Sequence, residues 1–165
     1  MKLYEPFKFL TDQECDDIIS YANGAEITAG TTLSKGTIRN NRVCWYKDSS
    51  RWAEWIAMFN EIDPVIDWIQ TPQIAFYKPG EQYKWHEDTW PKYRTHIRHF
   101  TLTCELQKAP GARLELEGKD FELQKGEAMI FKPEDRHRAV SPTEGERISF
   151  TIWAMALNQH KVDLS

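Results

Sequence analysis

Residues 100–131 read FTLTCELQKAPGARLELEGKDFELQKGEAMIF, and this segment indicates the fold class. Turn-forming residues at 109–111 (Ala-Pro-Gly) and 117–120 divide it into short pieces. Between the turns lie runs that favour β-strands, at 100–106, 113–116, 121–123 and 128–131. Short strands at close, even intervals are typical of a β-sandwich or of a double-sheet jelly roll.

Further strand signals lie on both sides of this segment. Residues 73–77 form a short apolar run that Pro79-Gly80 ends. On the C-terminal side, residues 138–140 and 148–154 are again strand-like. We therefore expect the second half of the chain to be rich in β-structure.

The first seventy residues carry helix signals instead. The sequence TDQE at 11–14 matches a capping box, in which the Thr and Glu side chains each satisfy a backbone N–H, and Gly24 is expected to end that helix. A second helix is expected to begin near Asp48 and to end before Pro64, because the residue before proline avoids the helical region. Its apolar face repeats at helical spacing, through Trp52, Trp55, Ile56 and Phe59. One further short turn is predicted over 65–69.

These signals predict an α+β chain that is mainly β, in which N-terminal helices pack on one sheet of a jelly roll. At 165 residues we expect a single domain over 1–165, with helical support at about 1–70 and the β core at about 73–156. A chain of this size buries roughly 70% of its unfolded surface, which is enough for a real core.

The composition argues against some classes of partner. The net charge is −4, whereas nucleic-acid binding depends on clustered Lys and Arg, so no nucleic acid is expected. No apolar run approaches transmembrane length and the N-terminus does not resemble a signal sequence, so no membrane partner is expected. Cys15, Cys44 and Cys104 show no metal or redox spacing, and we expect reduced, buried thiols in a cytoplasmic protein.

Two separated histidines and one carboxylate suggest a metal site. His86 and Asp88 are two residues apart, and on a strand such residues point the same way. A third ligand must come from another strand, and His137 follows Phe131-Lys132-Pro133, where a strand is expected to end. Two His and one carboxylate are the ligand set of non-haem Fe(II) oxygenases. Arg147, ten residues after His137, suits a dicarboxylate co-substrate, because its planar fork matches a carboxylate.

Ordinary structural roles are the alternative for each of these residues. His137 is flanked by Arg136 and Arg138, and charged neighbours usually mean an exposed loop. His86 could be an amphipathic residue at a strand edge. Each alternative is credible alone, but four such groups in this order are not expected by chance. His96 and His99 lie in a basic stretch that resembles a solvated edge strand.

At these residues the chain resembles the Fe(II)/2-oxoglutarate dioxygenases, and most of all their prolyl 4-hydroxylase-like, PKHD-type branch. The likeness covers about residues 74–154. It depends on YKPG at 77–80 with HED at 86–88, and on FKP at 131–133, HRAV at 137–140, PTEGER at 142–147 and Trp153. The resemblance implies a double-stranded β-helix.

The resemblance also implies residue roles and cofactors. Fe(II) is expected on His86, Asp88 and His137, which are then also the catalytic centre. Arg147 is expected to bind the distal carboxylate of 2-oxoglutarate, with Tyr77, Thr101 and Thr103 as further contacts. O₂ is the second co-substrate, and ascorbate is a candidate addition. Glu105 stands where several relatives carry an aromatic residue, and a carboxylate there could pair with Arg147.

The expected reaction is oxidative decarboxylation of 2-oxoglutarate coupled to hydroxylation of a C–H bond, in the first instance of a peptidyl proline at C4. Candidate substrate-binding residues are Trp90, Trp153, Tyr83 and Arg98. Other targets stay open, namely a free amino acid, another small molecule or a nucleobase. Two further readings are a cupin-like metal enzyme and a non-catalytic β-sandwich that binds a metal or a carbohydrate on its many aromatic residues. The sequence does not give the oligomeric state.

Overall fold

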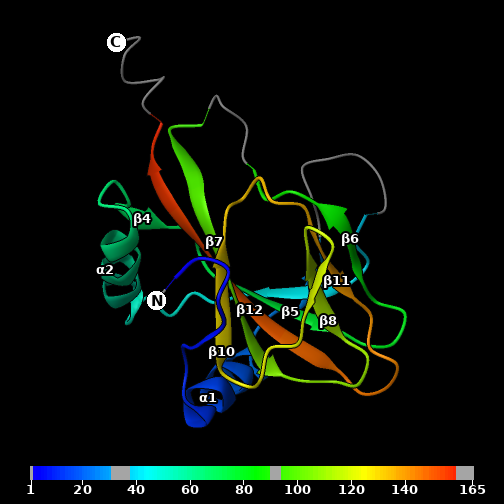
Figure 1. Cartoon of the computed structure of the whole chain (residues 1–165). Coiled ribbons are helices and arrows are strands. Elements are labelled where there is room, and N and C mark those ends of the chain that lie inside the picture. The colour runs from blue at the N-terminus through cyan, green and yellow to red at the C-terminus, as the bar shows by residue number, and fades with distance from the viewer. Residues whose placement is uncertain (1, 31–37, 90–93, 159–165) are drawn as a thin grey trace.

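The computed structural model describes residues 2–30, 38–89 and 94–158 (Figure 1). Two helices, α1 (Asp12–Asn23) and α2 (Trp52–Ile62), precede most of the β-structure in this described part. The strands are β1 (Phe7–Lys8), β2 (Thr28–Ala29), β3 (Arg42–Trp45), β4 (Trp68–Ile69), β5 (Gln73–Tyr77), β6 (Tyr83–His86), β7 (His96–Gln107), β8 (Arg113–Leu116), β9 (Lys119–Phe121), β10 (Glu127–Phe131), β11 (His137–Val140) and β12 (Arg147–Leu157).

The strands form two antiparallel sheets that face each other. The large sheet has the order β1-β10-β7-β12-β5-β3-β2, with β4 also paired to β12, and the small sheet has the order β6-β11-β8-β9. The long strands β7 and β12 pair through the middle of the large sheet. Figure 1 shows the small sheet on one side of the large sheet and both helices on the other. This is the double-stranded β-helix that the sequence predicted.

Alternation along β7 and β12 gives the large sheet two different faces. Leu102, Cys104 and Leu106 of β7 belong to the apolar cluster that the helices cover, whereas Thr101 and Thr103 point into the space between the sheets. On β12, Phe150 and Ile152 are likewise in the apolar cluster. Because successive strand residues point to opposite faces, the polar positions of both strands meet between the sheets. The interior of the jelly roll is therefore partly polar.

The helices close the other face of the large sheet. The capping box of α1 is present as predicted: Thr11 Oγ1 accepts from the Glu14 backbone N–H at 3.1 Å, and Glu14 Oε1 accepts from the Thr11 N–H at 3.0 Å. Trp55 and Phe59 of α2 are fully buried against the sheet. No helix among the described residues is long and apolar enough to cross a membrane.

Three local expectations need correction. The turn predicted over 65–69 contains β4, which pairs with β12 and buries Ile69 completely. Strand β3 was not expected in the first seventy residues, yet it pairs with β5 in the large sheet. Helix α2 begins at Trp52 rather than near Asp48. For β4 and β3, pairing with a distant strand decides the local structure, and such pairing leaves no signal in the local sequence. The later start of α2 follows a local turn, in which Asp48 Oδ1 accepts from the Ser50 backbone N–H at 3.0 Å.

Candidate metal centre

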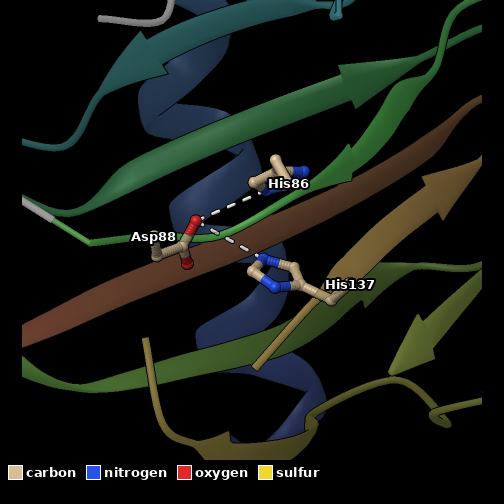
Figure 2. Close-up of side chains that lie close together, drawn as sticks. All are labelled: His86, Asp88 and His137. Carbon is tan, nitrogen blue, oxygen red and sulfur yellow. Dashed lines mark ion pairs between the residues drawn. The ribbon is translucent and has the colours of Figure 1, made fainter. Parts of the chain in front are cut away.

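Three side chains from separate parts of the chain converge between the sheets (Figure 2). His86 is the last residue of β6 and lies directly opposite His137, the first residue of β11. Asp88 lies two residues beyond β6 rather than on it, and its backbone N–H donates to the Pro133 carbonyl at 2.7 Å. This backbone bond fixes the loop so that the carboxylate turns back toward both imidazoles.

The donor atoms lie at distances that suit one ion. Asp88 Oδ1 is 3.4 Å from His86 Nε2 and 3.4 Å from His137 Nε2, and all three donor atoms lie within 4.8 Å of one another. Nitrogen and oxygen ligands lie about 2.1 Å from a divalent ion such as zinc, so two donors at right angles are roughly 3 Å apart. Two imidazoles and one carboxylate are also the right donors for non-haem iron. The residues therefore fit the metal that the sequence predicted.

Backbone carbonyls orient both imidazoles. His86 Nδ1 is 2.6 Å from the Lys84 carbonyl oxygen, and His137 Nδ1 is 2.9 Å from the Asp135 carbonyl oxygen. A carbonyl only accepts, so each Nδ1 carries the proton and donates. In the neutral ring this leaves the lone pair on Nε2, which is the nitrogen that faces Asp88.

The second oxygen of Asp88 is held by neutral donors. Thr101 Oγ1 donates to Asp88 Oδ2 at 2.9 Å, and Trp153 Nε1 donates to the same oxygen at 3.1 Å. Arg98 Nη1 donates to the Asp88 backbone carbonyl at 2.8 Å, and its guanidinium lies 4.1 Å from the centre of the Trp153 ring. Together these contacts leave Oδ1 free to face the two histidines.

Burial and mutual contact shift the pKa values of His86, Asp88 and His137 in different directions. Burial lowers the pKa of His86 below its usual value. Burial acts the same way on His137, but the Asp88 carboxylate outweighs it, so the pKa of His137 is raised. Burial pushes the pKa of Asp88 upward, yet the nearby histidines hold it well below its usual range. Asp88 is thus ionised, and a proton competes with a metal more strongly on His137 than on His86.

A cavity between the sheets connects this centre to Arg147. Its lining includes all three ligand residues and, on β12, Arg147, Ser149, Thr151 and Trp153. The cavity therefore runs along β12 from Trp153, beside Asp88, toward Arg147. The guanidinium of Arg147 is almost fully buried, and it lies 5.5 Å from the centre of the Tyr77 ring.

Arg147 is paired with Glu105 of β7. Its Nε donates to Glu105 Oε1 at 2.8 Å and to Oε2 at 3.1 Å. Burial lowers the pKa of Arg147, but Glu105 more than compensates and the net shift is upward. The pKa of Glu105 is raised by burial even though Arg147 opposes the shift. Arg147, where the sequence predicted a binding site for a carboxylate, thus lines the cavity while it is paired with a carboxylate of the protein itself.

The structure brings most of the remaining predicted residues to the cavity. Tyr77, Tyr83 and Thr103 line it, and Tyr83 stacks on His86 with ring centres 3.4 Å apart. Thr101 also lines it, with its hydroxyl used on Asp88, so it supports a proposed ligand as well as facing the co-substrate space. Trp90 lies outside the described residues. His96 and His99 do not line the cavity, and they pair with Asp67 and Asp63 instead.

Several lining residues were missed from the sequence. Ser149 and Thr151 share the face of Arg147, and the two-residue period from Arg147 could have identified them. Gln73 faces the cavity and accepts from Arg39 Nη2 at 3.3 Å, while the Arg39 guanidinium covers the Tyr83 ring at 4.2 Å. Nothing in the local sequence marks Gln73 or Arg39, because their role depends on the pairing of distant strands.

The comparisons with known proteins agree with this geometry. The model of the 2OG-Fe(II) oxygenase superfamily matches residues 72–155, which is about half of the chain. The chain belongs to this superfamily. It is therefore an Fe(II)- and 2-oxoglutarate-dependent dioxygenase that uses O₂, and the reading as a non-catalytic β-sandwich is wrong. No curated protein matches the sequence.

Solved structures of prolyl hydroxylases share the fold. A viral collagen prolyl hydroxylase from Paramecium Bursaria Chlorella virus-1, in complex with 2OG, is 26% identical with a TM-score of 0.71, and the match covers 94% of this chain and 97% of that one. A Pseudomonas putida prolyl-4-hydroxylase is 18% identical with a TM-score of 0.72, covering 92% and 91%. A Trichoplax adhaerens prolyl hydroxylase bound to a peptide fragment of hypoxia inducible factor is 19% identical with a TM-score of 0.67, covering 98% and 86%.

Proposed function

We propose that this protein hydroxylates a proline residue in a peptide or protein, with Fe(II) on His86, Asp88 and His137 and with 2-oxoglutarate on Arg147. The observation that carries the proposal is the convergence of three donor atoms within 4.8 Å of one another at one end of a cavity that also contains Arg147. The names of the similar structures support proline as the target. The overall reaction converts 2-oxoglutarate, O₂ and a C–H bond into succinate, CO₂ and a C–OH group.

The bound iron supplies the oxidising chemistry, and the protein supplies binding, orientation and a shielded site. His86, Asp88 and His137 would hold the ion, and all three line the cavity that also contains Arg147. Thr101 and Trp153 hold the Asp88 carboxylate in place, and neither donor carries a charge that would compete with the metal for it. The Nδ1 bonds of the histidines keep both rings in the tautomer that binds metal.

The other end of the cavity suits the distal carboxylate of 2-oxoglutarate. Arg147 provides the positive charge, and Tyr77 and Thr103 line the same space with hydroxyl-bearing side chains. Tyr77 is buried, and burial raises the pKa of its phenol, which therefore stays protonated and able to donate. These three residues, together with Thr101, are our proposed contacts to the co-substrate.

The substrate is proposed to approach over the aromatic residues next to the ligands. Tyr83 covers His86, and Trp153 lies beside Asp88 with the Arg98 guanidinium on its ring. Flat aromatic surfaces of this kind suit a proline ring, which packs well on aromatic side chains. Trp90 stays a proposed fourth contact on sequence grounds.

The three cysteines are free and buried, which supports the cytoplasm as the compartment.

Succinate release tests the proposal most directly. Purified protein with Fe(II), 2-oxoglutarate and O₂ is incubated with proline-containing peptides, free amino acids, other small molecules and methylated oligonucleotides. The expected result is succinate formation with the peptides and a gain of one oxygen atom at proline C4, and no formation by the Asp88→Ala variant. Turnover confined to another group of compounds would reject proline. Unchanged turnover in Asp88→Ala would reject the metal centre.

A further inference from the structure

The most unusual group next to the cavity is the carboxylate of Glu105, which is bonded to Arg147 of the cavity lining. The residue is 4% exposed and lies on the face of β7 that carries Thr101 and Thr103, the face toward the small sheet. Its partner is Arg147, which is 2% exposed. The function proposed above gives Glu105 no role. Burying a carboxylate costs free energy even when it is paired, so its presence here calls for an explanation.

The geometry of this ion pair is one-sided. Both carboxylate oxygens accept from Arg147 Nε, at 2.8 and 3.1 Å. The strongest pairing of a guanidinium would use two parallel bonds from two nitrogens. Within residues 2–30, 38–89 and 94–158 no other acceptor for Arg147 is found. Glu105 therefore neutralises the charge of Arg147 and leaves its terminal nitrogens for a second carboxylate.

We propose that Glu105 sets the affinity for 2-oxoglutarate by acting as a resident counter-ion of Arg147. This inference depends on the proposed role of Arg147 in co-substrate binding. In the empty cavity, Glu105 compensates a guanidinium that would otherwise be buried and unpaired. When the co-substrate enters, its distal carboxylate shares Arg147 with Glu105, and the two anions repel each other across it.

The sign of the effect follows from elementary electrostatics. A carboxylate gains less from a guanidinium that is already neutralised than from an isolated one, and the difference is large where water is excluded. Removal of the Glu105 charge should therefore tighten 2-oxoglutarate binding. The same removal leaves Arg147 as an uncompensated buried charge, so the ligand-free protein should lose stability. A residue with a purely structural role would produce only the second effect.

The chain offers a matched control in Glu115 of β8. Glu115 is 7% exposed and accepts from Arg113 Nη2 at 2.8 Å and from Arg138 Nε at 2.9 Å. Its neighbour Leu114 lines the cavity, so Glu115 points to the opposite face of the small sheet. Glu115→Gln removes another paired carboxylate of low exposure without touching the co-substrate space.

The test is 2-oxoglutarate binding to the Mn(II)-loaded protein without O₂, measured by titration calorimetry. We expect the Kd of Glu105→Gln to fall about tenfold, which corresponds to about 1.4 kcal/mol, and the Kd of Glu115→Gln to stay within about twofold of wild type. We also expect a lower unfolding temperature for ligand-free Glu105→Gln and a larger rise on adding 2-oxoglutarate than in wild type.

Each outcome has a definite meaning. An unchanged or weaker affinity in Glu105→Gln would overturn the counter-ion role, and equal tightening in Glu115→Gln would show that the effect is not local. If Glu105→Gln does not fold, Glu105→Met removes the same charge with a side chain of similar length and carries the same expectation. The proposed role of Arg147 would instead be rejected if the wild type did not bind 2-oxoglutarate, or if the single variant Arg147→Ala bound it as tightly as the wild type.

Discussion

The two ends of the cavity treat buried charge in opposite ways. At the metal end, the Asp88 carboxylate accepts from the neutral donors of Thr101 and Trp153, and the Arg98 guanidinium bonds the Asp88 backbone carbonyl rather than the carboxylate. At the far end, Arg147 is compensated within the protein by Glu105. One end is thus incomplete until an ion binds, whereas the other is charge-balanced when empty. If our proposals hold, the co-substrate competes with Glu105 for Arg147, whereas the metal meets no such competing group on the Asp88 carboxylate.

The largest effect should come from removing a ligand at the incomplete end. His137→Ala takes away one of three donors, and we expect metal affinity and turnover to fall by roughly three orders of magnitude, as for a loss of about 4 kcal/mol. The fold should persist, because His137 lies at a strand end outside the main apolar cluster. Metal content and circular dichroism measure these two results. Succinate formation at the wild-type rate would contradict the triad.

The second-largest effect should come from removing Arg147, which is paired with Glu105. Arg147→Ala should weaken 2-oxoglutarate binding by roughly two to three orders of magnitude, from about 2–5 kcal/mol for a buried charge pair. It should also destabilise the protein, because Glu105 is then buried without a partner. Calorimetric titration gives the affinity and thermal unfolding gives the stability.

The double variant Arg147→Ala/Glu105→Gln isolates the cause of that instability. It should recover part of the lost stability without recovering 2-oxoglutarate affinity, since neither charge remains. A double variant less stable than Arg147→Ala would show that the unpaired carboxylate is not the source of the loss.

A smaller loss of metal affinity should come from removing a hydrogen bond to the Asp88 carboxylate. Thr101→Val removes the hydroxyl that donates to Asp88 Oδ2 at 2.9 Å, and loss of such a support typically costs 10–100-fold in metal affinity, so we expect about that range. Thr103→Val is the matched control, because Thr103 lines the same cavity on the same strand without bonding Asp88. Equal losses of metal affinity in both variants would contradict the special role of Thr101.

The smallest effect is a pH dependence confined to the metal end. The pKa of His137 is raised, since the Asp88 carboxylate outweighs burial, and the proton competes with the metal for Nε2. Metal affinity should therefore be constant above that pKa and fall by about tenfold per pH unit below it. Mn(II) titrations between pH 8 and pH 5.5 would show this decline. Affinity that rises on acidification would contradict the assignment.

The sequence was informative where residue type and spacing alone indicate a function or a local structure. His86, Asp88, His137, Arg147 and the capping box of α1 could all be identified from the chain. The structure contains the capping box, brings the first three residues together and lines the same cavity with Arg147, while their roles stay predictions. The pairing of Glu105 with Arg147 was anticipated as an option. What remained hidden depended on which distant strands lie side by side: the pairing of β3 with β5, the strand β4, and the contact of Thr101 with Asp88. Local sequence does not encode such register, because burial against neighbours decides it.

The register of the small sheet has a mechanical consequence. His86 ends β6 and His137 opens β11 directly across from it, so an ion bound to both would fasten two strands whose residues are about fifty positions apart. Such a link restricts the chain much as a covalent crosslink does, and the longer the enclosed segment, the more freedom is removed from the unfolded chain. Iron binding should thus crosslink β6 and β11 of the small sheet and make local unfolding of that sheet rarer.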